Sequence, residues 1–360
     1  MTTASLAHPR AHHRDASADR LVQAWLACVA ALVMVMIIVG GATRLTDSGL
    51  SITEWQPLLG AIPPLSDSDW QLAFAKYQTI PQYQSVNKGM GLDAFKDIFW
   101  WEWAHRFLGR FIGLAFALPL AGFWLTGRIR AGWAPRLLGV LALGGIQGAL
   151  GWYMVKSGLA DRIDVSPNWL ALHLSVAFTL LGCLVWLILD LAPTRTEPWL
   201  QTLTAFQRAT AFGLVPLVFS QVALGGLVAG LKAGRAFNTW PLMDGRLIPD
   251  GFGRLEPWWR NLNENMATVQ FNHRLAAYLI VALGLWHTAT VIRAADDERV
   301  RVSGGLLALG LVSQMTLGIA TVLAAVPIGL GVAHQGLAAV VLVLAVWHAH
   351  TVAGTSLRRR

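Results

Sequence analysis

Four histidines have the residue type and the positions needed to bind a metal or a haem. They are His105, His173, His273 and His334, and each lies near the start of an apolar segment. We expect all four within about two helical turns of the same membrane surface. A histidine inside a membrane segment is by default a candidate functional residue. Because each half of the chain holds one pair, we predict that each pair brackets a haem iron as two axial ligands.

Zinc and copper are alternative occupants of these sites. Zinc usually takes three or four protein ligands, often with Cys or carboxylate, and copper sites often include Cys or Met. Neither pattern accompanies the four histidines in the sequence, so haem is the better match. The other six histidines have simpler interpretations. His8, His12 and His13 lie in a polar tail, and His287, His348 and His350 lie near the opposite helix ends, where an interfacial position costs little.

A carboxylate distinguishes the two halves of the chain. Glu102 precedes His105 by three residues, which places both on one face of a helix. The matching residue before His273 is Gln270, which cannot ionise. A carboxylate can accept a proton or stabilise positive charge, whereas an amide can only hydrogen-bond. We therefore expect catalysis in the first half and electron transfer in the second.

Basic and amide side chains accompany the histidines. Arg106, Arg110 and Arg274 could bind haem propionates, because arginine forms bidentate bonds with carboxylates. The alternative is that these side chains extend toward the membrane interface. Gln147, Gln221 and Gln314 lie in the apolar segments next to small residues, and we interpret them as ordinary helix-packing residues.

Composition predicts the elements that position these residues. The chain has 360 residues, of which 55% are hydrophobic and 13% charged, against about 25% charged in soluble domains. Its mean hydropathy is +0.50. These values exclude a disordered protein and favour a polytopic membrane protein. The apolar segments are 21–43, 111–127 (extended back past Arg110), 137–155, 165–189, 209–231, 275–292 and 302–357. The last is too long for one crossing, and Pro327, Gly329 and Gly331 divide it, which makes eight helices.

The distribution of charge predicts the orientation. The net charge is +8, and Lys and Arg concentrate in the N-terminal tail 1–20, the C-terminal tail and the short connections on one side. Basic loops are retained in the cytoplasm, so both termini should be cytoplasmic and the loops 44–103 and 232–270 should face outward.

The basic charge does not indicate a nucleic-acid partner, because the sequence has no compact module in which basic and aromatic residues alternate. Cys28 and Cys183 lie in apolar segments, which makes a disulfide improbable. Because about 20 residues precede the first helix, a bacterial inner membrane is favoured over a mitochondrial one.

The sequence also contains an internal repeat. Glu102-Trp-Ala-His105-Arg106 resembles Gln270-Phe-Asn-His273-Arg274, and Gly40-Gly41 resembles Gly225-Gly226. The repeat unit has four crossings, and an even number preserves orientation, so the halves should be related by an axis along the membrane normal. We predict an all-α protein in which residues 21–192 and 193–360 form two tandem four-helix bundles with sites in their cores.

Several long motifs resemble the haem A synthase family, and the similarity covers about residues 21 to 352. In the first half they run from Gly40 through Trp55 to Ile62-Pro63-Pro64, and from Phe99 through Glu102 and His105-Arg106 to Gly109-Arg110. In the second half they include Asn238-Thr-Trp-Pro241 and Asn263-Glu264-Asn265 through His273-Arg274. The first outer loop has no Cys, which matches the proteobacterial and mitochondrial form of the family rather than the form with a cysteine pair.

The resemblance implies an eight-helix enzyme that converts haem O to haem A for cytochrome oxidase. A porphyrin ring methyl would become a formyl group through a hydroxymethyl intermediate. His273 and His334 would ligate a resident haem b, His105 and His173 would bracket haem O, and Glu102 would be the essential carboxylate. A haem held by two histidines has no open iron position, which favours attack by water on the oxidised methyl carbon, with Glu102 as candidate base.

Two other functions are compatible with parts of the pattern. A dihaem b-type cytochrome that takes electrons from quinol would explain the histidines and the repeat, but not the difference between Glu102 and Gln270. A transporter would need broken helices and buried charge near the membrane centre, and the sequence predicts neither. Expected partners are membrane lipid, a haem O synthase and an unidentified electron acceptor or donor, and an oligomer is possible.

Overall fold

A computed structural model describes residues 16–56, 59–192 and 203–354 of the chain. The remaining residues are outside this description. They include most of the predicted cytoplasmic tail with His8, His12 and His13, the segment 193–202 around the predicted boundary between the halves, and the C-terminal arginines.

Eight helices in the described part of the chain are long and apolar enough to cross a membrane, which confirms the predicted all-α, multi-pass fold class. They are α1 (Ala16–Leu45), α4 (Leu92–Leu125), α5 (Ala134–Asp161), α6 (Pro167–Leu191), α7 (Ala205–Gly230), α8 (Met266–Ala294), α9 (Glu298–Leu323) and α10 (Ile328–Gly354). The predicted break in segment 302–357 is confirmed, because α9 ends at Leu323 and α10 begins at Ile328.

The second crossing is longer than predicted. Segment 111–127 is only the inner part of α4, which begins at Leu92. Hydropathy missed the outer turns because they contain charged residues. Several of these are paired in the structure: Lys96 with Asp93, and Glu102 with Arg106. The longer helix places Glu102 and His105 on its outer half.

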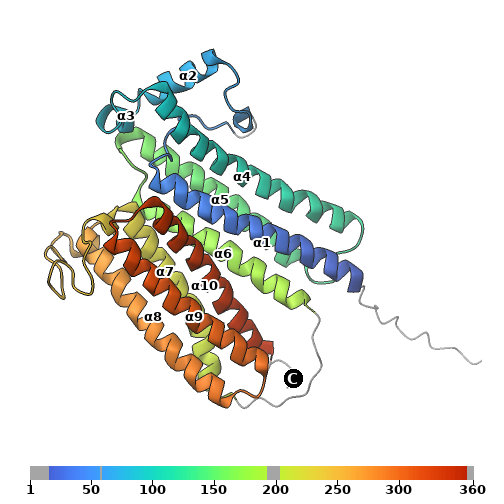
Figure 1. Cartoon of the computed structure of the whole chain (residues 1–360). Helices are drawn as coiled ribbons and strands as arrows, with labels where there is room; N and C mark the ends of the chain where they lie inside the picture. The colour runs from blue at the N-terminus through green and yellow to red at the C-terminus, as the bar shows by residue number, and fades with distance from the viewer. Residues whose placement is uncertain (1–15, 57–58, 193–202, 355–360) are drawn as a thin grey trace, which may run out of the picture.

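The helices pack as two closed groups of four. In the first, α1 contacts α4 and α6, and α5 contacts α4 and α6; in the second, α7 contacts α8 and α10, and α9 contacts α8 and α10. The groups meet where α6 contacts α7 and α10, and where α1 contacts α10 (Figure 1). A two-fold axis that exchanges the halves would convert the α1–α10 contact into the α7–α6 contact, so this pattern supports the predicted repeat.

The two groups differ in how tightly they are packed. In the apolar windows of α4 and α5, 11% and 6% of residues are buried, whereas the values for their counterparts α8 and α9 are 33% and 28%. Contacts between α4 and α5 are also much sparser than those between α8 and α9. The first half therefore has a looser outer side than the second.

Both long outer loops lie at the same end of the helices, opposite the first residue of α1 and the last turn of α10 (Figure 1). The first loop carries η1 (Leu59–Ala61), α2 (Asp67–Tyr77) and α3 (Pro81–Ser85), and the second carries η2 (Ala233–Arg235) and η3 (Trp258–Leu262). Helix α2 begins with a capping box between Ser66 and Asp69. Its buried aromatic side chains pack against Phe95 and Phe99 of α4, which fixes the loop over the outer end of that helix.

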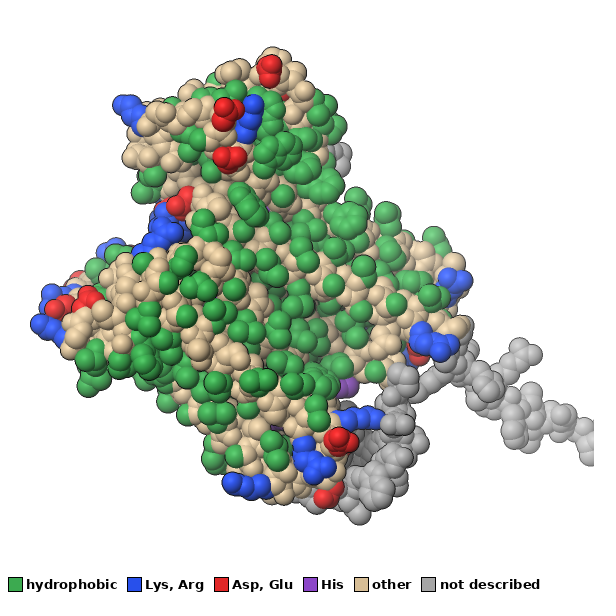
Figure 2. Space-filling view, in the orientation of Figure 1, with side chains coloured by type: hydrophobic (Ala, Val, Ile, Leu, Met, Phe, Trp, Pro, Cys, Tyr) green, Lys and Arg blue, Asp and Glu red, His purple; other side chains and the backbone are tan. Residues whose placement is uncertain are grey.

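Charged side chains gather at the two ends of the molecule, and apolar side chains cover the flanks between them (Figure 2). This distribution is typical of a protein whose flanks contact lipid.

Candidate functional site

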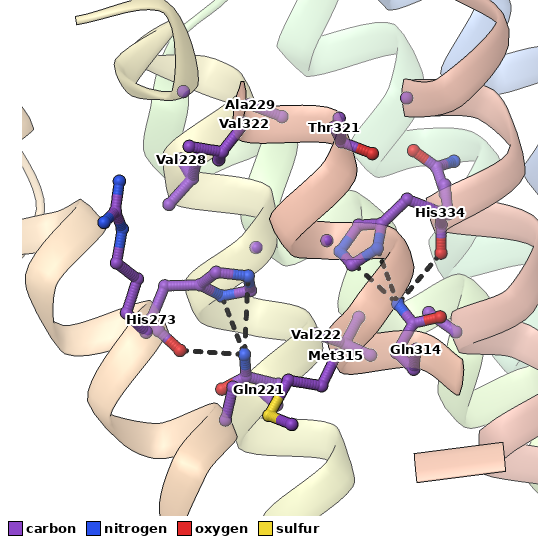
Figure 3. Close-up of a pocket in the computed structure, with 18 of the residues that line it drawn as sticks. Gln221, Val222, Val228, Ala229, His273, Gln314, Met315, Thr321, Val322 and His334 are labelled. Carbon is purple, nitrogen blue, oxygen red and sulfur yellow. Dashed lines mark hydrogen bonds between the residues drawn. The ribbon is translucent and has the colours of Figure 1, made fainter. Parts of the chain in front are cut away.

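The second histidine pair lines an apolar cavity. His273 projects from α8 and His334 from α10, and the two rings point into the cavity from opposite sides (Figure 3). The cavity has a volume of about 270 Å³. Many of its lining side chains are apolar, among them Phe178, Val218, Val222, Ile280 and Leu311. Two imidazoles facing each other across an apolar space are the arrangement expected of a bis-histidine haem site.

Glutamine side chains position these two histidines. The Nε2 atom of Gln221 lies 3.1 Å from Nδ1 of His273 and donates to the His273 carbonyl at 2.9 Å. Gln314 does the same for His334, at 3.2 Å and 2.9 Å (Figure 3). In the first half, Gln147 lies 3.3 Å from Nε2 of His173. All three glutamines thus contact a histidine on a neighbouring helix, which agrees with their interpretation as helix-packing residues and adds that the side chain they contact is a site candidate.

A glycine on a neighbouring helix packs against each of the four histidines. An added Cβ atom would lie 3.0 Å from Cε1 of His105 at Gly40 and 2.9 Å from Cε1 of His173 at Gly151. The same distances are 3.2 Å for Gly225 and His273, and 2.8 Å for Gly318 and His334. A glycine thus backs each of the four candidate histidines, which lie on α4, α6, α8 and α10, and Gly304 backs a further histidine of α10, His348, at 3.3 Å.

The residues present fit a haem in each half better than a multi-ligand metal ion. In the first half, the buried Nδ1 atoms of His105 and His173 have no hydrogen-bond partner, so no protein group occupies these ring nitrogens. Among the residues that the structure describes, no group of three or more His, Cys, Asp and Glu side chains could hold a metal ion. This disfavours the zinc alternative, since zinc usually takes at least three protein ligands.

Glu102 is buried and fully engaged with the first outer loop. Its carboxylate accepts hydrogen bonds at 2.8 Å from both Ser51 Oγ and the Ile52 amide. It also accepts from Nε and Nη2 of Arg106, at 3.0 and 2.6 Å. The side chains of Glu102 and Arg106 are 3% and 11% exposed, so this is a buried ion pair. The structure therefore places the predicted carboxylate one turn from His105, between α4 and the loop.

The second half repeats this loop contact without the carboxylate. Arg106 donates to the carbonyls of Ile52 and Glu54 at 2.7 and 2.9 Å. Arg274 donates to the carbonyls of Phe237 and Thr239, both at 2.8 Å. Phe237 and Thr239 follow Ile52 and Glu54 by the same 185 residues that separate Gly225 from Gly40. Gln270, in the place of Glu102, donates to the Phe237 carbonyl at 3.1 Å.

Arg106, Arg110 and Arg274 thus have loop carbonyls as partners. Arg110 donates to the carbonyl of Gln56 at 3.0 Å. Arg106 and Arg110 also line a cavity of about 370 Å³ beneath the first outer loop, and Arg274 lines the cavity of His273 and His334. Their predicted contact with propionates stays a prediction, and their observed role is to tie the outer loops to α4 and α8.

The interpretation of His287 and His348 as interfacial residues was wrong. Both are 0% exposed, and their Nε2 atoms lie 2.9 Å apart. Thr210 Oγ1 lies 2.8 Å from Nδ1 of His287, and Ser303 Oγ lies 2.8 Å from Nδ1 of His348. Each helix of the second group supplies one residue, and the network satisfies all of these ring nitrogens. A sequence signal existed: His287 follows His273, and His348 follows His334, by 14 residues, or about four turns on one helix face.

His350 lies near the end of α10, as predicted. Its Nε2 atom is 3.0 Å from Oδ1 of Asp190 at the end of α6, and both side chains are partly exposed. Cys28 and Cys183 are free thiols, in agreement with the prediction of no disulfide.

The fold and the histidines together define a multi-pass helical membrane protein with one pair of glycine-backed candidate histidines in each of two helical groups. The model of the COX15-CtaA family, described as cytochrome oxidase assembly protein, matches residues 23–346. The chain belongs to this family.

Similar proteins cover almost the whole chain. A relative from Azorhizobium caulinodans named heme A synthase is 52% identical over 337 residues, which are 93% of this chain and 95% of the relative. Relatives of the same name from Chelativorans sp. and Parvibaculum lavamentivorans are 51% and 50% identical. These matches cover 91% of this chain in each case, and 90% and 93% of the respective relatives.

Proposed function

We propose that this protein is a haem A synthase, which oxidises a ring methyl of haem O to a formyl group through a hydroxymethyl intermediate. The observation that carries the proposal is the difference between two otherwise matched sites. Each half has two glycine-backed candidate histidines and an arginine that binds the outer loop, but only the first has a buried carboxylate next to its histidine. The identity of about 50% with proteins named heme A synthase supports the same activity.

We assign His273 and His334 to a resident haem b, and His105 and His173 to haem O. The tighter packing of α8 and α9 and the glutamines on both histidines suit a cofactor that stays bound. The sparse contacts between α4 and α5 suit a lipophilic substrate that must enter and leave. When bound, haem b supplies one-electron redox chemistry, which lets electrons leave the substrate site.

We assign to Glu102 a fixed negative charge beside the substrate pair. Four donors fix its carboxylate in place. A carboxylate held in this way needs no reorganisation to stabilise positive charge that develops on a nearby substrate during oxidation. The role of a general base for water is the alternative.

We also propose that both termini are cytoplasmic and that the protein lies in a bacterial inner membrane. Arg136 and the basic residues Arg293, Arg299 and Arg301 lie at the helix ends opposite the outer loops, in agreement with the rule that basic loops stay inside. A haem O synthase would be the natural donor of the substrate, since a farnesylated porphyrin is poorly soluble in water. An electron acceptor or donor would complete the cycle.

The experiment is expression in a host that makes haem O but no haem A, followed by pigment extraction and mass analysis. We expect haem A from the wild-type protein. His105→Met and His173→Met should each abolish haem A and leave the haem b spectrum of the purified protein. His273→Met and His334→Met should each perturb that spectrum. Extraction of haem b alone from the wild type would contradict the synthase and support the dihaem cytochrome.

A further inference from the structure

An ionic cluster joins the two halves at their outer ends. Nη1 of Arg44, at the end of α1, lies 2.9 Å from Asp47 and 3.3 Å from Asp164. Nζ of Lys232, just after α7, lies 3.0 Å from each of the same two carboxylates. Nη2 of Arg44 also donates to the carbonyl of Gly230 at 3.2 Å. Two cations and two carboxylates therefore connect the first half to the beginning of the second outer loop.

Two members of the cluster occupy equivalent positions of the repeat. Lys232 follows Asp47 by 185 residues, the same separation that relates Gly40 to Gly225. Both residues have a backbone φ of 53°, and both come directly after a membrane helix. The two side chains contact each other, so the equivalent positions meet between the halves and carry opposite charges.

The cluster forms part of the wall of the cavity that contains His273 and His334. Four cationic side chains, Arg44, Lys232, Arg235 and Arg274, line that cavity, together with the carboxylate of Asp47. The side chain of Arg44 is 11% exposed, and its Nε atom is buried with no hydrogen-bond partner. A buried guanidinium N–H without a partner is costly, and it suits a carboxylate ligand that enters the cavity.

The repeat does not supply these cations twice. Arg44 corresponds to Ala229, Lys232 to Asp47, and Arg235 to Leu50 by the same separation of 185 residues. Arg274 corresponds to Arg106, which is already paired with Glu102. In the lining of the second cavity the four cations outnumber the one carboxylate, so a dianionic porphyrin there would meet net positive charge.

We propose that Arg44 and Lys232 bind the propionate carboxylates of the haem held between His273 and His334, and that these cations retain it. Their equivalents in the repeat, Ala229 and Asp47, are not cations, so the haem between His105 and His173 has no such anchors and leaves as product. This inference rests on the proposed function for the presence of haem in the second cavity. It adds that an arginine of the first half completes the cofactor site of the second.

The test measures haem release from the purified full-length protein in detergent, with excess apomyoglobin as the scavenger and the Soret band as the readout. Arg44→Gln and Lys232→Met each remove one charge-assisted bond, so release should accelerate about ten-fold or more in each variant. Arg246→Gln is the matched control, because it removes an exposed ion pair with Asp250 in the same outer loop. Its release rate should equal that of the wild type.

A second variant separates haem binding from simple attachment of the halves. Asp164→Asn removes a carboxylate that pairs with both Arg44 and Lys232 but keeps both cations at the cavity. We expect this variant to release haem at the wild-type rate. Wild-type release from both single variants, or release from Asp164→Asn as fast as from Lys232→Met, would overturn the proposal. Absence of haem b from the wild-type protein, or its persistence in the double variant His273→Met with His334→Met, would instead contradict the proposed function.

Discussion

Replacing Glu102 with Gln should open the first outer loop locally without unfolding the membrane helices. The carboxylate accepts bonds from Ser51, Ile52 and Arg106, and an amide would turn its NH₂ group toward some of these donors. Arg106 would also lose its counter-ion in a site where its side chain is only 11% exposed. Removal of one partner from a buried ion pair costs about 3–5 kcal/mol. The carbonyls of Ile52 and Glu54 would still hold the guanidinium, so we take the lower end of this range.

The Ile52 amide offers a direct assay, because it donates to Glu102 Oε2. A loss of about 3 kcal/mol in local stability corresponds to hydrogen exchange that is about 100-fold faster. Exchange within α6 and α10 should be unchanged, since those helices do not depend on this loop. Wild-type exchange at Ile52 in Glu102→Gln would refute the reasoning about the buried pair.

The double variant Glu102→Gln with Arg106→Gln separates a structural carboxylate from a functional one. When both charges are removed, neither is left buried without its partner. The loss of local stability in the double variant should therefore be about 2 kcal/mol smaller than the sum of the losses in the two single variants. We expect haem A yield to stay lost in Glu102→Gln and in the double variant, because neither has the negative charge. Recovery of haem A together with slow exchange in the double variant would show that Glu102 only anchors the loop.

Two further predictions concern the second helical group. Gly318→Ala would place a Cβ atom 2.8 Å from Cε1 of His334 and should displace that ring, which would lower the haem b content of the purified protein; Gly305→Ala on the same helix meets open space and should leave the content unchanged. His287→Phe should lower the free energy of unfolding by about 1–3 kcal/mol, because it leaves His348 and a hydroxyl unpaired in the core. Thermal unfolding monitored by circular dichroism, with haem content as a control, measures this effect, and an unchanged midpoint would contradict the structural role of the network.

Much of the architecture follows from local properties of the sequence. The eight spans, the break before α10 and the positions of the four site histidines come from hydropathy and helical spacing, which depend on neighbouring residues only. The outer turns of α4 show the limit of this reasoning. The charged residues in these turns led us to predict a loop there. In the structure Glu102 and Arg106 pair with each other within the helix, and this pairing becomes visible only when the side chains are placed.

The sequence by itself determined that this is a multi-pass helical protein with two matched histidine pairs and one carboxylate, three residues before the first of these histidines. The tertiary structure decided which polar groups meet. It paired His287 with His348, placed glutamines against the site histidines, and brought Arg44 of the first half to the cavity of the second. These contacts join residues 20 to 186 positions apart, and the packing of different helices sets them, whereas composition and periodicity report only on the helix to which each residue belongs.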